Sequence, residues 1–144
     1  MSGEKREITE KVYREEGVAL LLLRCSEEPI PPLATPRADR RLDAFCAAAE
    51  KEVIAFAERV RVPALREAYL ADENPKKRFT ARPQILTFTR TFGEEENALI
   101  LSVTCTLSFR GRVLSKTEKV LRFDKETGFL LPLKKKRAKK KGRG

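Results

Sequence analysis

The run NALILSVTCTLSFRG constrains the fold more than any other part of the chain. Over residues 99–109, apolar and small polar side chains alternate, with Ile100 as the exception. A period of two is typical of a strand with one buried and one solvated face. QILTFTRTF, at residues 84–92, has the same period, and GEEEN joins the two runs. The second half of the chain therefore predicts an antiparallel sheet.

Further strands are predicted on both sides of this pair. Residues 7–14 alternate weakly, Glu15-Glu16-Gly17 resembles a turn, and VALLLLRC (18–25) is a short apolar run typical of a buried strand. SKTEKVLRF (115–123) is predicted as another strand, and DKETG (124–128) as a tight turn. The last run, FLLPL, is predicted as an edge strand because Pro132 cannot donate to a ladder.

One long helix is predicted between the two groups of strands. Thr35 is the expected N-cap, with Pro36 at the first helical position. Apolar residues then recur at steps of three and four and form one stripe. The stripe comprises Leu42, Phe45, Cys46, Ala49, Val53, Phe56, Ala57 and Val60. Pro63 is expected to end this helix and to begin a short second one.

The predicted fold class is α+β. One apolar helix stripe and one apolar sheet face must bury each other, which gives a two-layer sandwich of an antiparallel meander sheet with one long helix packed on one face. The expected core is a single cluster formed by Phe45, Val53, Phe56, Leu101, Val103 and Leu107.

The chain ends in a dense basic run. We expect residues 1–133 to form a single α+β domain and 134–144 to be a disordered tail, because like charges at this density repel one another. The tail contributes +8 of the net charge of +10, through Lys134, Lys135, Lys136, Arg137, Lys139, Lys140, Lys141 and Arg143. Two roles remain open for it: sequence-independent binding of nucleic acid or another polyanion, and solubilising protection of the preceding edge strand.

No motif in the chain indicates catalysis. Histidine is absent, which removes the commonest general base and metal ligand. Cys46 and Cys105 fall in the apolar stripes and are expected to be buried and inert, whereas the environment of Cys25 stays open. The carboxylates gather in predicted turns, and no phosphate-binding glycine motif occurs. We expect no catalytic residue, no metal site and no cofactor.

The outward sheet face is the other candidate recognition surface. It carries the hydroxyl side chains of Thr87, Thr89, Ser102, Thr104, Thr106 and Ser108. Such a face is either the solvated side of an antiparallel sheet or a site for a polar ligand or a protein partner.

The N-terminal region and the cysteines favour a cytoplasmic protein, provided that the chain is the full gene product. MSGEKREITEKVYREEG has no apolar core of a signal peptide. No apolar run approaches the length of about 20 residues that a membrane span needs. The three cysteines form no CxxC pair, which suits a reducing compartment.

Three segments together resemble a bacterial domain-of-unknown-function family. They are RLDAFCAAAEKEVIAFAERV as the long helix, LILSVTCTLSF as a central strand, and VLRFDKETGFLLPL, which is similar to the family's strand, "FD-x-x-TG" turn and closing apolar run. The family occurs in the extracellular part of a lysozyme-sensing anti-sigma factor and beside peptidoglycan deacetylase domains. RGRVLSKTE stands where many members carry a histidine. The resemblance implies a fold and a binding role, and no catalytic residue.

The expected function is therefore that of a non-enzymatic binding module. The alternative is a nucleic-acid-associated or polyanion-associated protein that acts through the tail, and an enzyme is a third hypothesis. A basic groove on the folded body would favour the second hypothesis. A deep pocket that holds a desolvated carboxyl group would favour the third.

Overall fold

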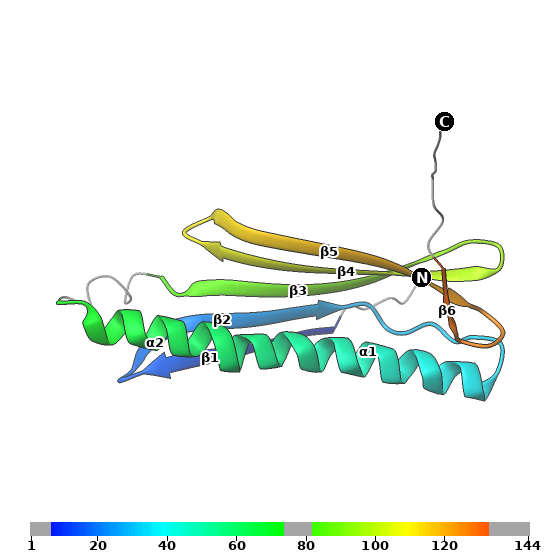
Figure 1. Ribbon diagram of the computed structural model, residues 1–144, viewed down its shortest axis with the longest axis horizontal. Helices are drawn as coiled ribbons and strands as arrows, with labels where there is room; N and C mark the ends of the chain where they lie inside the picture. The colour runs from blue at the N-terminus through cyan, green and yellow to red at the C-terminus, as the bar shows by residue number, and fades with distance from the viewer. Residues whose placement is uncertain (1–6, 74–81, 133–144) are drawn as a thin grey trace.

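The computed structural model describes residues 7–73 and 82–132. Within them, six strands form one curled sheet in which strand order follows chain order (Figure 1). The strands are β1 (Glu7–Glu15), β2 (Val18–Glu27), β3 (Gln84–Glu94), β4 (Ala98–Phe109), β5 (Arg112–Asp124) and β6 (Leu130–Leu131). The helical segment between β2 and β3 lies along one side of the sheet, so the α+β class is confirmed.

The sheet is mixed, and the prediction of an antiparallel meander is wrong on this point. β2 and β3 pair in parallel, while every other neighbouring pair in the described sheet is antiparallel. The cause is the helix between them. A chain that leaves one strand, runs back along a helix and re-enters the sheet must place the second strand parallel to the first.

The short second helix predicted at Pro63 is confirmed, but the helical segment is not broken there. α1 (Pro36–Phe56) passes through a π-helical turn, η1 (Ala57–Arg61), into α2 (Val62–Ala71), and the backbone N–H of Val62 bonds to the carbonyl of Ala57. A proline inside an α-helix clashes with the carbonyl four residues earlier. Because the π-turn widens the helix just before Pro63, the proline becomes an early residue of α2 instead of a helix terminator.

Both predicted features of the helix start, the N-cap and the proline that follows it, are confirmed at the N-terminus of α1. The Thr35 hydroxyl accepts a hydrogen bond of 3.0 Å from the backbone N–H of Ala38, and Pro36 opens the helix. Thr35 also donates to the carbonyl of Glu126, 3.3 Å away. The helix start is thereby tied to the turn between β5 and β6.

That turn, DKETG, is closely fitted to the helix. The Asp124 carboxylate accepts the backbone N–H groups of Glu126 and Thr127, at 2.7 and 3.0 Å. Gly128 has a φ of +77°, and a Cβ atom placed there would lie 2.7 Å from the carbonyl oxygen of Ala38. Glycine is needed here both for the left-handed backbone and for the close approach to the helix.

The core consists of two clusters rather than one. The first joins β2, β3 and the C-terminal half of the helical segment, and includes Leu21, Leu23, Val53, Ala57, Leu65, Tyr69, Leu86, Phe88 and Leu107. The second joins the N-terminal half of α1 to β4 and β5, and consists of Leu42, Cys46, Leu99, Leu101 and Phe123. The helix therefore crosses the sheet diagonally.

The expected single core cluster is consequently wrong in its extent. Val53 and Leu107 belong to the first cluster and Leu101 to the second, with Phe45 and Val103 only partly buried. Phe56 is 39% exposed. An apolar stripe on a helix predicts that all its residues contact one region of the sheet. Because the helix crosses the sheet diagonally, the two halves of the stripe contact opposite ends of the sheet instead.

Candidate functional site

The helix leaves one corner of the sheet uncovered. Leu23, Leu86 and Leu107 are cross-strand neighbours on β2, β3 and β4, and all three are buried. The next residue in the same row is Ser115 on β5, and it is exposed. Cover by the helix therefore ends between β4 and β5 at this end of the sheet.

The other end of the same two strands is fully covered. Leu99 and Phe123 are directly paired across β4 and β5, and their exposed fractions are 1% and 2%. The ring of Phe45 from α1 packs edge-on against Phe123, with centroids 5.1 Å apart. The N-terminal half of α1 thus closes this end.

A groove lies between the uncovered corner and the middle of α1. We call it the β4–β5 groove, and its volume is about 560 Å³. Its helix wall is formed by Phe45, Ala48, Ala49, Glu52, Val53 and Phe56. Its sheet wall includes Leu86, Phe88, Val103, Cys105, Leu107, Ser115, Thr117, Lys119 and Leu121. Five of the six residues that we expected to form a filled core line this hollow.

The β4–β5 groove has the chemistry of a binding site for an apolar group. Its walls are mainly aliphatic and aromatic, with the hydroxyls of Ser115 and Thr117 on the β5 side. Its charged lining residues are Glu52, Glu118 and Lys119, so the groove has no excess of basic groups. Its volume falls within the range of about 300–1,000 Å³ that is usual for ligand sites.

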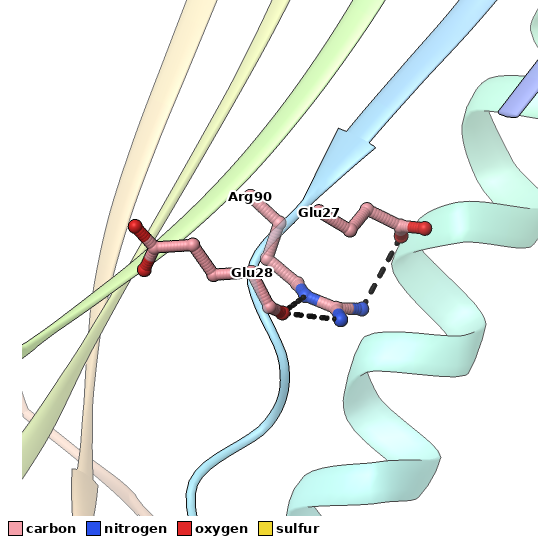
Figure 2. Close-up of polar contacts among 3 residues, drawn as sticks. All are labelled: Glu27, Glu28 and Arg90. Atoms are coloured by element: carbon pink, nitrogen blue, oxygen red, sulfur yellow. Dashed lines mark hydrogen bonds and ion pairs between the residues drawn. The ribbon is translucent and has the colours of Figure 1, made fainter. Parts of the chain in front are cut away.

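A buried ion pair lies next to the groove. Arg90 of β3 donates to the Glu27 carboxylate at 3.2 Å and to the Glu28 carbonyl oxygen through two nitrogens, at 3.2 and 2.7 Å (Figure 2). Glu27 and Arg90 are only 5% and 8% exposed. The guanidinium therefore fixes the end of β2 against β3.

This polar pair separates the two core clusters. Glu27, Arg90, Val103 and Lys119 form one row across four strands, between the rows that carry the two clusters. Burial raises the pKa of the Glu27 carboxyl group, and the Arg90 charge opposes that increase. Neither Glu27 nor Arg90 lines the β4–β5 groove.

The thiols differ from one another in exposure. Cys25 and Cys46 are buried, and burial raises the pKa of each to about 11. For Cys46 this confirms the predicted buried thiol. Cys105 is half-buried and lines the β4–β5 groove, so the prediction of a buried thiol is wrong there. Desolvation raises its pKa as well.

The predicted hydroxyl face lies on the side of the sheet opposite the helix. Thr87 pairs with Thr106 and Thr89 with Thr104, and these four side chains are partly buried. Ser102 and Ser108 continue the same face of β4. Whether this face binds a ligand stays a prediction. The predicted basic tail, 134–144, lies outside the described residues.

Within residues 7–73 and 82–132, no helix is both long enough and apolar enough to cross a membrane. The same residues contain no group of three or more His, Cys, Asp or Glu side chains that could hold a metal ion.

Comparison with known proteins supports the fold. No family model matches the sequence, and no curated protein matches it. The crystal structure of a DUF3298 family protein from Pseudomonas aeruginosa is similar, with a TM-score of 0.51 and 13% identity. The match covers 89% of this chain and 54% of that one, so this chain spans about half the length of its structural neighbour. At this identity the likeness shows the fold alone, and that fold is one found in a family of unknown function.

The groove is the feature that the sequence interpretation missed. A signal for it exists on β5, where the positions facing the helix are Ser115, Thr117 and Lys119 before they become Leu121 and Phe123. On β4 the same rows carry Leu107, Cys105 and Val103. A change from polar to apolar along one face of a strand marks where the cover of the helix begins.

Proposed function

We propose that this chain is a non-enzymatic binding module whose β4–β5 groove holds an apolar part of its partner. The observation that carries the proposal is the groove itself. It is a hollow of about 560 Å³ with mainly apolar walls, located where the diagonal helix leaves one end of β5 uncovered. Burying such walls against an apolar group removes nonpolar surface from water and favours association.

The position of the desolvated carboxyl group favours binding over catalysis. An enzyme would need its perturbed acid or base in the pocket that holds the substrate. Here the buried carboxylate, Glu27, is paired with Arg90 and lies outside the lining of the groove. Within the groove walls, the charged residues are Glu52, Glu118 and Lys119.

The resemblance noted in the sequence also supports a binding role. The "FD-x-x-TG" segment is the turn that fixes the start of α1 to the sheet, because its carbonyl groups accept hydrogen bonds from Thr35 and Arg41 and Gly128 lies against Ala38. In the family that it resembles, the domain occurs in the extracellular part of a lysozyme-sensing anti-sigma factor. For this chain the resemblance supports a binding role outside catalysis.

A fluorescent apolar probe tests the proposed function. We expect the full-length chain to bind anilinonaphthalene sulfonate in the β4–β5 groove, with an increase in fluorescence. Thr117→Trp should fill the groove and weaken probe binding at least tenfold. Lys116→Trp is the matched control, because the neighbouring side chain on β5 points to the opposite face.

Two results would refute the proposal. One is a full-length chain that leaves the fluorescence of the probe unchanged. The other is a Thr117→Trp variant that binds the probe as tightly as the Lys116→Trp control. Reaction of the Cys105 thiol gives an independent readout, since a bound probe should slow the labelling of a residue that lines the groove.

The basic tail carries an alternative proposal, the binding of polyanions. Residues 1–133 hold 23 basic and 21 acidic residues, so removal of 134–144 leaves a net charge of +2. We expect a chain that ends at Leu133 to lose most of its binding to mixed RNA. Binding by the full chain should weaken by up to about 0.9 logarithmic units per tenfold increase in salt for each phosphate neutralised. Equal affinity of the two chains would refute this alternative.

A further inference from the structure

The outer edge of β5 is open over most of its length. β6 pairs with β5 only at Arg122 and Phe123, and Pro132, which has no N–H, follows β6 directly. At its other end β5 begins after the turn formed by Arg110 and Gly111, both with positive φ. Among the strands that the structure describes, none pairs with the outer side of residues 113–121.

An edge of this kind can pair with another strand. In an antiparallel ladder, every second residue directs both its N–H and its C=O away from its existing partner. Proteins commonly protect such edges with a proline or a bulge. Both edge strands contain one register shift, β1 between Tyr13 and Arg14 and β5 at Leu114, whereas residues 115–121 of β5 contain no proline and pair regularly with β4.

The open stretch is symmetric in its chemistry. Its midpoint is Thr117, with Lys116 on one side and Glu118 on the other. We propose that two copies of this chain pair antiparallel through residues 115–119 of β5, with Thr117 on the two-fold axis. A self-complementary surface of this kind is what a two-fold dimer requires.

Charge selects this register. With Thr117 on the axis, Lys116 lies opposite Glu118 of the partner subunit, and the same contact recurs on the other side. Opposite charges that face each other across strands stabilise the pair. Within one copy the two side chains are already exposed and 3.4 Å apart. Registers centred one residue to either side would instead place Lys116 opposite its own copy, or Glu118 opposite its own copy.

The symmetric stretch ends at Ser115, because Leu114 occupies the register shift of β5. The basic tail of the chain itself is a poorer occupant of this edge, since its lysines would face Lys116 and Lys119.

The pairing would place both grooves on one face. Residues that are opposite each other in an antiparallel pair direct their side chains to the same side of the sheet. Thr117, which lines the β4–β5 groove, would therefore lie beside its own counterpart, and Ser115 beside Lys119 of the partner subunit. The two grooves would flank the new strand pair.

Charge reversal tests this proposal on the full-length chain. We expect sedimentation equilibrium to show a monomer–dimer equilibrium for the native chain. Lys116→Glu and Glu118→Lys should each weaken self-association about tenfold or more, because like charges then face each other twice. The double variant with both changes should restore it to within about threefold. Leu130→Lys serves as a control for exposed substitutions elsewhere on the sheet edge.

Three outcomes would overturn the proposal: a native chain that stays monomeric, single variants that dimerise like the native chain, or a double variant that does not recover. Hydrogen exchange provides the second measurement. Alternate amides in residues 115–119 should gain protection as the protein concentration rises, and uniform protection would contradict strand pairing. Binding of anilinonaphthalene sulfonate by a monomeric chain would leave the proposed groove function intact, so the two failures are distinguishable.

Discussion

The two ends of the β4–β5 pair have opposite environments, although they belong to the same two strands. At the covered end, Leu99, Leu101 and Phe123 are almost completely buried under the N-terminal half of α1. At the open end, Ser115 and Thr117 are exposed and border a groove. Alternation along a strand determines which side chains face the helix layer, and the path of the helix determines which of them are buried.

This difference separates stability from binding. The covered end has large apolar contacts, a docked turn and a capped helix, all of which restrict movement. The open end has small polar residues on β5 and a wall of Leu107 and Val103 on β4 that a partner can cover. The following predictions test whether the two ends are as different in free energy as they are in burial.

The largest effect is expected at the covered end. Phe123→Ala should lower the free energy of unfolding by about 4 kcal/mol, because it removes a 2% exposed ring that packs against Phe45. Thr117→Ala, on the same strand and the same face, should change it by less than about 0.5 kcal/mol. Urea denaturation of both variants measures the difference. Similar losses would mean that the open end is also part of the core.

The next largest effect on stability is expected at the buried ion pair between the two ends. Arg90→Met should destabilise the protein by about 3 kcal/mol, since the buried Glu27 carboxylate then lacks its ion-pair partner. Adding Glu27→Leu to this variant should recover a large part of the loss. A single variant as stable as the native chain would show that the pair is not buried in solution.

Substitution of two glycines with the same backbone angle allows a direct comparison of the two ends. Gly128 and Gly111 both have a φ of +77°, but only Gly128 has backbone atoms of Ala38 where a Cβ would lie. Gly111→Ala should cost about 1 kcal/mol from its left-handed backbone alone. Gly128→Ala should cost about 2 kcal/mol more, in line with an added steric clash. Equal losses of stability in thermal denaturation would mean that the turn does not lie in close contact with α1.

The smallest expected effects concern the reactivity of the three thiols. At pH 8 an aromatic disulfide reagent should label Cys105 first, because that side chain is partly exposed in the groove. Cys25 and Cys46 should react slowly, with rates that rise as the pH approaches their pKa of about 11. Cys105→Ser should remove the fast phase, and all three thiols should react in denaturant. A fast reaction of Cys46 would contradict its place under α1.

The local elements were predictable because their signals are local. The alternation at 84–92 and 99–109 identified β3 and β4, and Thr35-Pro36 identified the start of α1. The alternation also placed hydroxyl residues of both strands on one outward face, where Thr89 pairs with Thr104. Each of these depends on residues that are near one another in the chain.

The global features were not predictable in the same way. The parallel β2–β3 pair depends on the direction in which the helix returns. The position of Pro63 inside a continuous helical segment depends on a π-turn that no single residue encodes. Phe56 belongs to an apolar stripe, yet its exposure depends on the angle at which α1 crosses the sheet. The groove follows from that same angle, so the candidate site could be inferred only weakly, from the polar positions on β5.

The crossover between β2 and β3 has a consequence for the kinetics of folding. β3, β4 and β5 pair through short hairpins, whereas Leu23 must find Leu86 across a loop of more than sixty residues. Contacts of high sequence separation are formed late, because the entropy of closing the loop must be lost before they are made. We therefore expect the three-stranded ribbon to form early and the parallel pair to limit the rate. The last event would be the docking of the helix, which buries Val53 and Leu65 on one side and leaves the groove on the other.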